Sequence, residues 1–277
     1  TKQPQATPYY SFQQQIGSYH FFRTTGDATG PLTKDGSLLY RFNLAYENSE
    51  SFRGFVDRKT IFFAPVVKWN VSPRTQITAE MEYHNINTKS DGLLPALGNR
   101  PAPIPISRYL DEPSFSKSAN ERFFTGLNWS HELNDDWKIT HRLSGEFIHG
   151  RGHREIVPFS SVQPDGTVQR FLADVPPGQQ ENRYQSSLNL IGHFDTGMVK
   201  HTLLVGYDFL YQTDKYSVAK CCDTDTASNF PINVFNPVYP SMDPSLFDTL
   251  RRNSPNDFGV IKDSWFGLYF QDQITLW

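Results

Sequence analysis

The sequence predicts an all-β chain whose antiparallel strands run up and down as part of the wall of a transmembrane β-barrel. Three observations predict this fold. Apolar and polar residues alternate in about ten segments, the clearest segments run to about ten to thirteen residues, and short connections alternate with long ones. A strand tilted by about 45° needs about 9 to 11 residues to cross the hydrocarbon layer of a membrane, whereas strands of soluble proteins usually have about five or six.

Each expected strand has one apolar and one polar face. The first two are the weaker segments at residues 8–16 and 19–30, and the last is residues 263–277. Asp272 falls on the apolar face of this last segment, and burial does not explain it. The apolar faces of the strands between them consist of Leu38, Tyr40, Phe42, Leu44 and Tyr46; Ile61, Phe63, Val67, Trp69 and Val71; Ile77, Ala79, Met81 and Tyr83; Phe123, Leu127 and Trp129; Trp137, Ile139, Leu143 and Phe147; Leu188, Leu190 and Phe194; and Leu203, Val205, Tyr207, Phe209 and Tyr211.

The connections between these strands alternate in length. Short ones are expected at residues 31–36, 70–74, 131–136 and 195–200, and long ones at about 48–59, 85–120, 149–182 and 212–262. Membrane barrels have tight turns on the periplasmic side and long loops on the extracellular side. We therefore expect four long extracellular loops at one end of a single barrel domain that occupies residues 1–277.

Charge and hydropathy argue against two classes of protein, those that bind nucleic acid and those that cross a membrane with helices. The net charge is −3 and no run of Lys or Arg occurs, so no nucleic-acid partner is expected. The longest apolar stretch, residues 61–67, is far shorter than the 18 to 20 or so residues that a spanning helix needs, so any membrane crossing would use strands. The first twenty residues lack the features of a signal peptide, which predicts a mature chain or a fragment.

Several stretches resemble TonB-dependent siderophore receptors, especially the ferric hydroxamate uptake type. They are Thr1-Lys-Gln-Pro4, Thr29-Gly-Pro-Leu32 with Gly36-Ser-Leu-Leu-Tyr-Arg-Phe42, Leu110-Asp-Glu-Pro113, His201-Thr-Leu-Leu-Val-Gly-Tyr-Asp-Phe209, Phe235-Asn-Pro-Val238 and Tyr269-Phe-Gln-Asp-Gln-Ile274. They follow the order of the family across nearly the whole chain.

The resemblance implies a receptor in the outer membrane of a bacterium, surrounded by outer-membrane lipid. Such receptors have a 22-stranded barrel filled by an N-terminal plug domain, and they take up ferric siderophores with energy from the TonB complex. This chain would supply about ten of the 22 strands, with residues 1–7 as the end of the linker between plug and barrel. It has no plug and no TonB box, so we expect a truncated or fragmentary sequence. No covalently bound cofactor is expected, and the ferric siderophore is the transported ligand.

Ligand contacts implied by the resemblance belong to the long loops and the upper lumen, because siderophore pockets of this family use aromatic side chains. Where hydroxamate-type receptors have aromatic residues in the third loop, this chain has Asp91-Gly-Leu-Leu-Pro95, so its siderophore is expected to differ. The candidate ligand-binding residues are Tyr109, Phe115, Phe159, Phe230, Phe235 and Tyr239, each of which packing within a loop would also explain.

Other chemistry-bearing residues favour structural roles. The cluster from His149 to Glu155 contains two glycines that disfavour the helix needed to bring its histidines together, so no metal site is expected. Cys221 and Cys222 are adjacent, so a disulfide between them would be strained, and two free thiols are equally compatible with the sequence. The charged residues on the inward faces should face the lumen; they are Arg41, Glu80, Glu82, Arg142 and Glu146. The aromatic residues on the outward faces should form girdles at the membrane interfaces; they are Trp69, Tyr83, Trp129 and Trp137.

No nucleophile-elbow, phosphate-loop or zinc-protease motif occurs in the sequence, so we expect no enzyme. Two alternatives from other classes remain open at this point. One is an outer-membrane enzyme on a closed ten-stranded barrel, and the other is a passive pore or adhesin.

Overall fold

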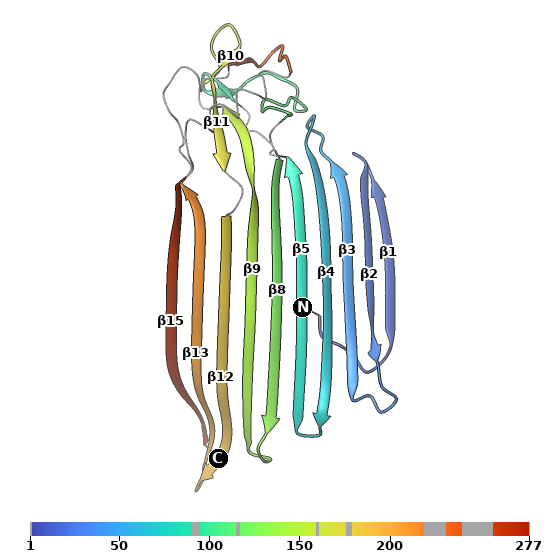
Figure 1. Ribbon diagram of the computed structural model, residues 1–277, viewed down its shortest axis with the longest axis vertical. Helices are drawn as coiled ribbons and strands as arrows, with labels where there is room; N and C mark the ends of the chain where they lie inside the picture. The colour runs from blue at the N-terminus through green and yellow to red at the C-terminus, as the bar shows by residue number, and fades with distance from the viewer. Residues whose placement is uncertain are drawn as a thin grey trace.

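The computed structural model describes residues 2–89, 95–114, 117–158, 161–175, 179–218, 231–239 and 257–276. Ten long strands follow one another in a single antiparallel meander, which Figure 1 shows as one curved sheet. No helix among the described residues is long and apolar enough to span a membrane. The strands are β1 (Tyr9–Gly17), β2 (Phe21–Pro31), β3 (Leu38–Glu50), β4 (Asp57–Ser72), β5 (Thr75–Lys89), β8 (Lys117–Glu132), β9 (Trp137–Pro158), β12 (Gln179–Thr196), β13 (Val199–Val218) and β15 (Asp257–Leu276).

The all-β, up-and-down prediction is confirmed, and the sheet is open. Each long strand pairs with its neighbour along the chain, and the described residues of β1 and β15 form no ladder with each other. The alternative of a closed ten-stranded barrel is therefore wrong. Among the described residues, the sheet therefore has two unpaired edges, at β1 and at β15.

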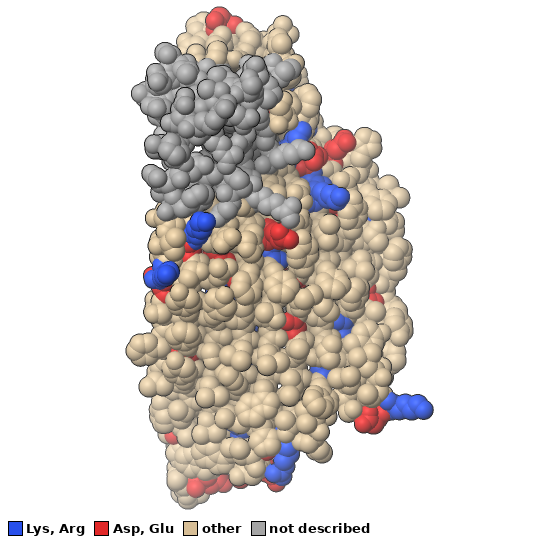
Figure 2. Space-filling model, viewed as in Figure 1, with Lys and Arg blue, Asp and Glu red and all other residues tan. Residues whose placement is uncertain are grey.

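One face of the sheet exposes large apolar side chains. On β4, Ala64 and Val66 are buried on one side, while Ile61, Val67 and Trp69 are well exposed on the other. We call the side with Val66 the inner face and the side with Trp69 the outer face. Figure 2 shows one face of the sheet on which few charged side chains lie between the two ends. Apolar residues exposed along whole strands are typical of a surface that contacts something other than water.

Tight turns close one end of the sheet. Residues 32–37, 73–74, 133–136 and 197–198 join successive long strands there. Gly36 and Gly197 adopt positive φ angles of 69° and 67°, where a side chain would be strained. In the third turn, Asn134 Oδ1 accepts hydrogen bonds from the backbone N–H groups of Asp136 and Trp137, at 2.9 and 2.8 Å. These four short connections are confirmed.

The expected bounds of the long loops were wrong, because the strands extend further than their apolar pattern. The first loop, expected at residues 48–59, consists only of residues 51–56, and β5 continues to Lys89 rather than ending before residue 85. Likewise β9 runs to Pro158, β12 begins at Gln179, β13 ends at Val218 and β15 begins at Asp257. The strand ends on this side carry mostly polar side chains, such as Asn48, Lys59 and Asn87, so the alternation stops there while the backbone ladder continues.

Two further features complete the long-loop end. The β1–β2 connection at this end is only residues 18–20, with Tyr19 and His20 at φ angles of 59° and 51°, and its shortness agrees with the expected segments at residues 8–16 and 19–30. The long loops also contain short strands: β6 (Ala96–Leu97), β7 (Arg100–Pro101), β10 (Thr167–Val168), β11 (Arg170–Val175) and β14 (Ile232–Asn233).

Asp272 does lie on the outer face, as the alternation predicts, and it has a partner there. His201 of β13 lies 2.7 Å from its carboxylate, and the other ring nitrogen of His201 lies 2.7 Å from the hydroxyl of Thr196. The ring of His201 also stacks on Phe194 at 4.7 Å between centroids. This small polar group lies next to the turn at residues 197–198, which explains why the apolar face tolerates an acidic residue.

Candidate functional site

The loop segments at the long-loop end pack against one another into a folded unit. We call residues 51–56, 95–114, 161–170 and 231–239 the loop cap. Backbone hydrogen bonds join its segments: Val162 N–H donates to Ala96 O at 2.9 Å, and Val234 N–H donates to Gly166 O at 2.9 Å. Its apolar core consists of Ala102, Leu110, Val162, Val168, Ile232 and Val234, with Leu97, Ile104 and Tyr239 packed against it.

Fully buried charges lie beside this core. Arg170, Asp111 and Glu112 have no exposed surface, and Arg170 Nη1 donates to the carbonyl of Leu110 at 2.9 Å. Burial lowers the pKa of the Arg170 guanidinium, and the nearby carboxylates of Glu112 and Asp111 oppose this by favouring its charged form. The buried charge set ties the segment around Leu110 to the start of β11.

A pocket of about 290 Å³ opens in the loop cap between three of its segments. Phe55 forms one wall, and its ring centroid lies 5.7 Å from that of Tyr109 and 5.4 Å from that of Tyr239. The hydroxyl of Tyr239 donates a hydrogen bond to the carbonyl of Tyr109. Burial raises the pKa of Tyr239, which keeps this phenol protonated as a donor. We call this the cap pocket; it is lined by Gly54, Phe55, Pro105, Ser107, Arg108, Tyr109, Pro237 and Tyr239.

The structure brings three of the six predicted ligand residues into this region. Tyr109 is only 2% exposed and packs inside the cap, whereas Tyr239 is half-buried at the pocket. Phe235 is 43% exposed, and its carbonyl accepts a hydrogen bond from Arg108 at 3.2 Å. Phe115, Phe159 and Phe230 lie outside the described residues, as do Cys221 and Cys222.

Sequence reasoning missed Phe55, Ser107 and Arg108. Phe55 lies in a loop that was expected to be longer, and its φ angle of 66° is rare for an aromatic residue. The only signal for Arg108 was its position next to the predicted Tyr109. Nothing in the spacing of these residues indicates that the loop at residues 51–56 meets the loop at residues 95–114.

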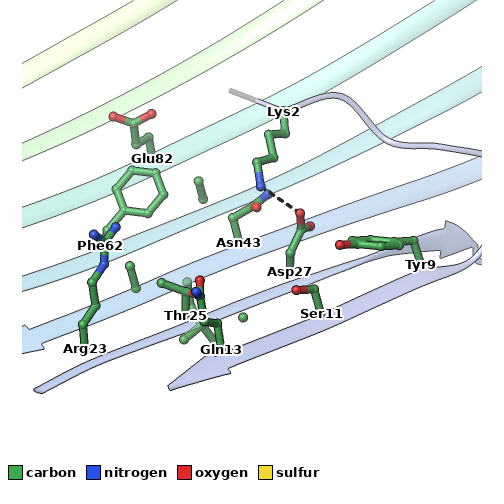
Figure 3. A pocket seen from close by; sticks show the side chains of 14 residues that line it. Lys2, Tyr9, Ser11, Gln13, Arg23, Thr25, Asp27, Asn43, Phe62 and Glu82 are labelled. Carbon is green, nitrogen blue, oxygen red and sulfur yellow. Dashed lines mark hydrogen bonds and ion pairs between the residues drawn. The ribbon is translucent and has the colours of Figure 1, made fainter. Parts of the chain in front are cut away.

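A second hollow, of about 660 Å³, lies on the inner face of the first strands. Figure 3 shows Asp27 and Asn43 of neighbouring strands pointing into it, with Lys2 reaching Asp27 from the N-terminal segment. The distance from Lys2 Nζ to the Asp27 carboxylate is 2.9 Å, and Arg41 donates to the same carboxylate at 2.7 and 3.0 Å. Arg41 also donates to the carbonyl of Gln3 at 3.0 Å, so the residues before β1 are held against the inner face.

The predicted inward charges share this face and form ion pairs. Arg122 donates to both Glu82 and Glu146, and Arg183 Nη1 lies 3.2 Å from Glu146. Arg142 lies 3.6 Å from Glu80. Cross-strand pairs of opposite charge stabilise neighbouring strands, which is a sufficient role for these residues.

The predicted outward aromatics lie on the outer face. In the strand register, Ile77 lies between Trp69 and Trp129 near the turns, while Tyr83 lies further along β5 and donates to Glu121 at 2.7 Å. Within the described part of the chain, no three His, Cys, Asp or Glu residues lie close enough to hold a metal ion. The side chains of His153 and Glu155 lie outside the described residues, so the absence of a metal site in the cluster from His149 to Glu155 stays a prediction.

Comparisons with known proteins identify the family. The family described as TonB dependent receptor-like, beta-barrel matches residues 63–277. The metal-pseudopaline receptor CntO of Pseudomonas aeruginosa strain UCBPP-PA14 is 29% identical over 283 residues, which cover 99% of this chain and 37% of that protein. The ferrichrome outer membrane transporter/phage receptor of Escherichia coli K12 is 22% identical, over 99% of this chain and 38% of that protein.

Solved structures agree on the fold. BauA, the ferric preacinetobactin receptor of Acinetobacter baumannii, has a TM-score of 0.78 at 14% identity and covers 100% of this chain and 40% of that chain. The open form of Fiu, the ferric-catecholate import receptor of E. coli K12, has a TM-score of 0.78 at 17% identity, and the match covers 99% of this chain and 43% of that chain. The chain spans 37 to 43% of the length of these relatives. It belongs to the TonB-dependent receptor β-barrel family, a family of bacterial outer-membrane receptors and transporters rather than enzymes.

Proposed function

We propose that the receptor to which this chain belongs takes up ferric siderophores across the bacterial outer membrane, with energy supplied by the TonB complex. The proposal rests on one observation: the same sheet combines two different faces with a folded loop cap at one end. A strand lattice with an apolar outer face and a charged inner face supports a passage through lipid, and a folded loop cap with an aromatic pocket supports capture of a ligand at its mouth. The printed names of the relatives, which include receptors for ferrichrome and pyoverdine, support the same ligand class.

In this proposal, outer-membrane lipid covers the outer face, and the inner face surrounds a plug domain. Residues 1–7 then form the end of the linker between the plug and the wall. The contacts of Lys2 and Gln3 with Asp27 and Arg41 support this placement, since they fix the linker on the inner side. Tyr239 and Phe235 are the predicted aromatics with surface available to a ligand, whereas the burial of Tyr109 favours a role in shaping the pocket.

A chelate of another transition metal is a second candidate ligand. The relative CntO is a receptor for metal-pseudopaline, and its similarity extends over 99% of this chain. The two candidates share a mechanism and differ in the metal carried.

Uptake by living cells tests the proposal. A strain that lacks the gene is compared with the same strain carrying the full receptor, with radioactive iron, nickel or zinc supplied as siderophore complexes. We expect uptake of a ferric siderophore that requires both the receptor and TonB, and expression that rises when iron is restricted. Uptake that does not need TonB would instead indicate a passive pore, and uptake confined to nickel or zinc complexes would favour the second candidate.

Deletion of residues 217–256 tests the role of the loop that carries Phe235 and Tyr239. We expect this deletion to abolish uptake, because it removes one side of the cap pocket and part of the core of the loop cap. The amount of folded receptor in isolated outer membranes serves as the control. Unchanged uptake would exclude this loop from the mechanism.

A further inference from the structure

We infer that the cap pocket binds a carboxylate group of the metal chelate, with the Arg108 guanidinium as the cation that recognises it. This inference rests on the proposed function and specifies the ligand class further: chelates that retain a free carboxylate. With a volume of about 290 Å³, the pocket suits one arm of such a chelate rather than the whole molecule.

The guanidinium of Arg108 has no carboxylate partner in the part of the chain that the structure describes. Its Nη2 donates to the carbonyl of Phe235 at 3.2 Å, while its Nε is buried and has no acceptor within that part of the chain. Among the described residues, no acidic group forms an ion pair with Arg108. Arg41, Arg122 and Arg183 of the sheet, in contrast, each pair with a carboxylate. A partly buried guanidinium without a counter-ion favours binding of an anion, because the charge is already desolvated and oriented.

The acidic residues closest in sequence do not fill this role. Asp111 and Glu112 are completely buried, and their charges favour the charged form of Arg170, which donates a hydrogen bond to the neighbouring carbonyl of Leu110. The charge of Arg108, in turn, opposes the rise that burial causes in the pKa of Tyr239, whose half-buried phenol lies at the pocket. The positive charge of Arg108 is therefore available on the pocket side of the loop cap.

The other walls suit a planar group. Phe55 is 52% exposed, and its ring meets that of Tyr239 nearly at right angles, with an interplanar angle of 67°. The unusual backbone of Phe55 is supported by Gly54, whose N–H donates to the carbonyl of Ser107 at 3.0 Å. An arginine presents two parallel N–H donors that match the two oxygens of a carboxylate, and aromatic rings exclude water from that pairing.

Equilibrium binding to the purified full receptor tests the inference with two probes. The first is ferric citrate, which carries free carboxylates, and the second is a neutral ferric trihydroxamate without carboxylates. We expect the native receptor to bind ferric citrate and Arg108→Gln to weaken that binding by at least about tenfold, as removal of a partly buried charge partner should. Arg108→Lys should restore part of the affinity, because it keeps the charge without the paired donors.

Arg100→Gln is the matched control, since Arg100 is an exposed arginine of the same loop and does not line the pocket. It should leave the affinity for ferric citrate unchanged. Failure of the native receptor to bind ferric citrate would overturn the inference, as would an equal loss of both probes or unchanged ferric citrate binding in Arg108→Gln. In each of these cases the proposed function stands if cells still take up another ferric siderophore through the receptor, and it falls only if they take up none.

Discussion

Gly206 of β13 allows an aromatic ring to lie directly on the backbone of the neighbouring strand. A Cβ atom at Gly206 would collide with the ring of Tyr269, its partner on β15. The hydroxyl of Tyr269 reaches across β13 and donates to Asn189 of β12, so one side chain bridges three strands of the inner face. The residue at position 206 must therefore be glycine for this bridge to form.

Substitution Gly206→Val should destabilise the full receptor by about 1 to 3 kcal/mol, since the tyrosine must leave its position or strain the ladder. The midpoint of urea unfolding in a lipid bilayer measures this. Gly267→Ala is the control, because Gly267 lies on the same face of β15 and a Cβ there would meet nothing within 4 Å. Equal midpoints for Gly206→Val and Gly267→Ala would show that the bridge contributes no stability.

At the residue scale, the sequence predicted which face each side chain occupies but not which side chains meet. The alternation assigned Glu80, Glu82 and Glu146 to the inner face, where the structure has them. The partner of Asp272 could not be predicted, because His201 lies 71 positions earlier and the contact depends on the register of two strands. The same reason applies to Phe55 and Arg108, whose loops meet only in the folded loop cap.

At the scale of elements, the long strands were predictable and their ends were not. A strand between an apolar and a polar medium shows its alternation in the sequence, so all ten were found. The short strands β6, β7, β10 and β14 pair within the long loops and have no such pattern. Their position depends on the core that the loops form together.

The loop cap should open when its buried cation is removed. Arg170→Met leaves Asp111 and Glu112 buried without this positive neighbour, which should cost the loop cap about 3 to 5 kcal/mol of folding free energy. The barrel strands should keep their structure, because Arg170 lies opposite Pro158, the last residue of β9. Protease digestion of intact cells checks this: cleavage within residues 95–114 should become faster, with the barrel fragments remaining in the membrane.

Arg100→Met provides the comparison for protease digestion, because Arg100 is exposed in the same loop. Its cleavage rate should match that of the native receptor. If Arg170→Met is cleaved no faster than Arg100→Met, the buried charges do not hold the loop cap together.

At the scale of the whole molecule, the two faces of the open sheet differ in character, and so do its two ends. Its outer face exposes large apolar residues of β15, including Phe266, Leu268 and Phe270. Its inner face carries the ion pairs and the hollow shown in Figure 3. Tight turns close one end of the sheet and the loop cap occupies the other (Figure 1).

Spin labels placed one at a time along β13 of the full receptor in a lipid bilayer test this two-faced wall most directly. Labels at Leu203, Val205 and Tyr207 face outward and should collide mainly with oxygen dissolved in the lipid. Labels at Thr202, Leu204 and Asp208 face inward and should be shielded from that oxygen. A period of two residues in oxygen accessibility is the predicted result, and equal accessibility at the two sets of positions would contradict the account.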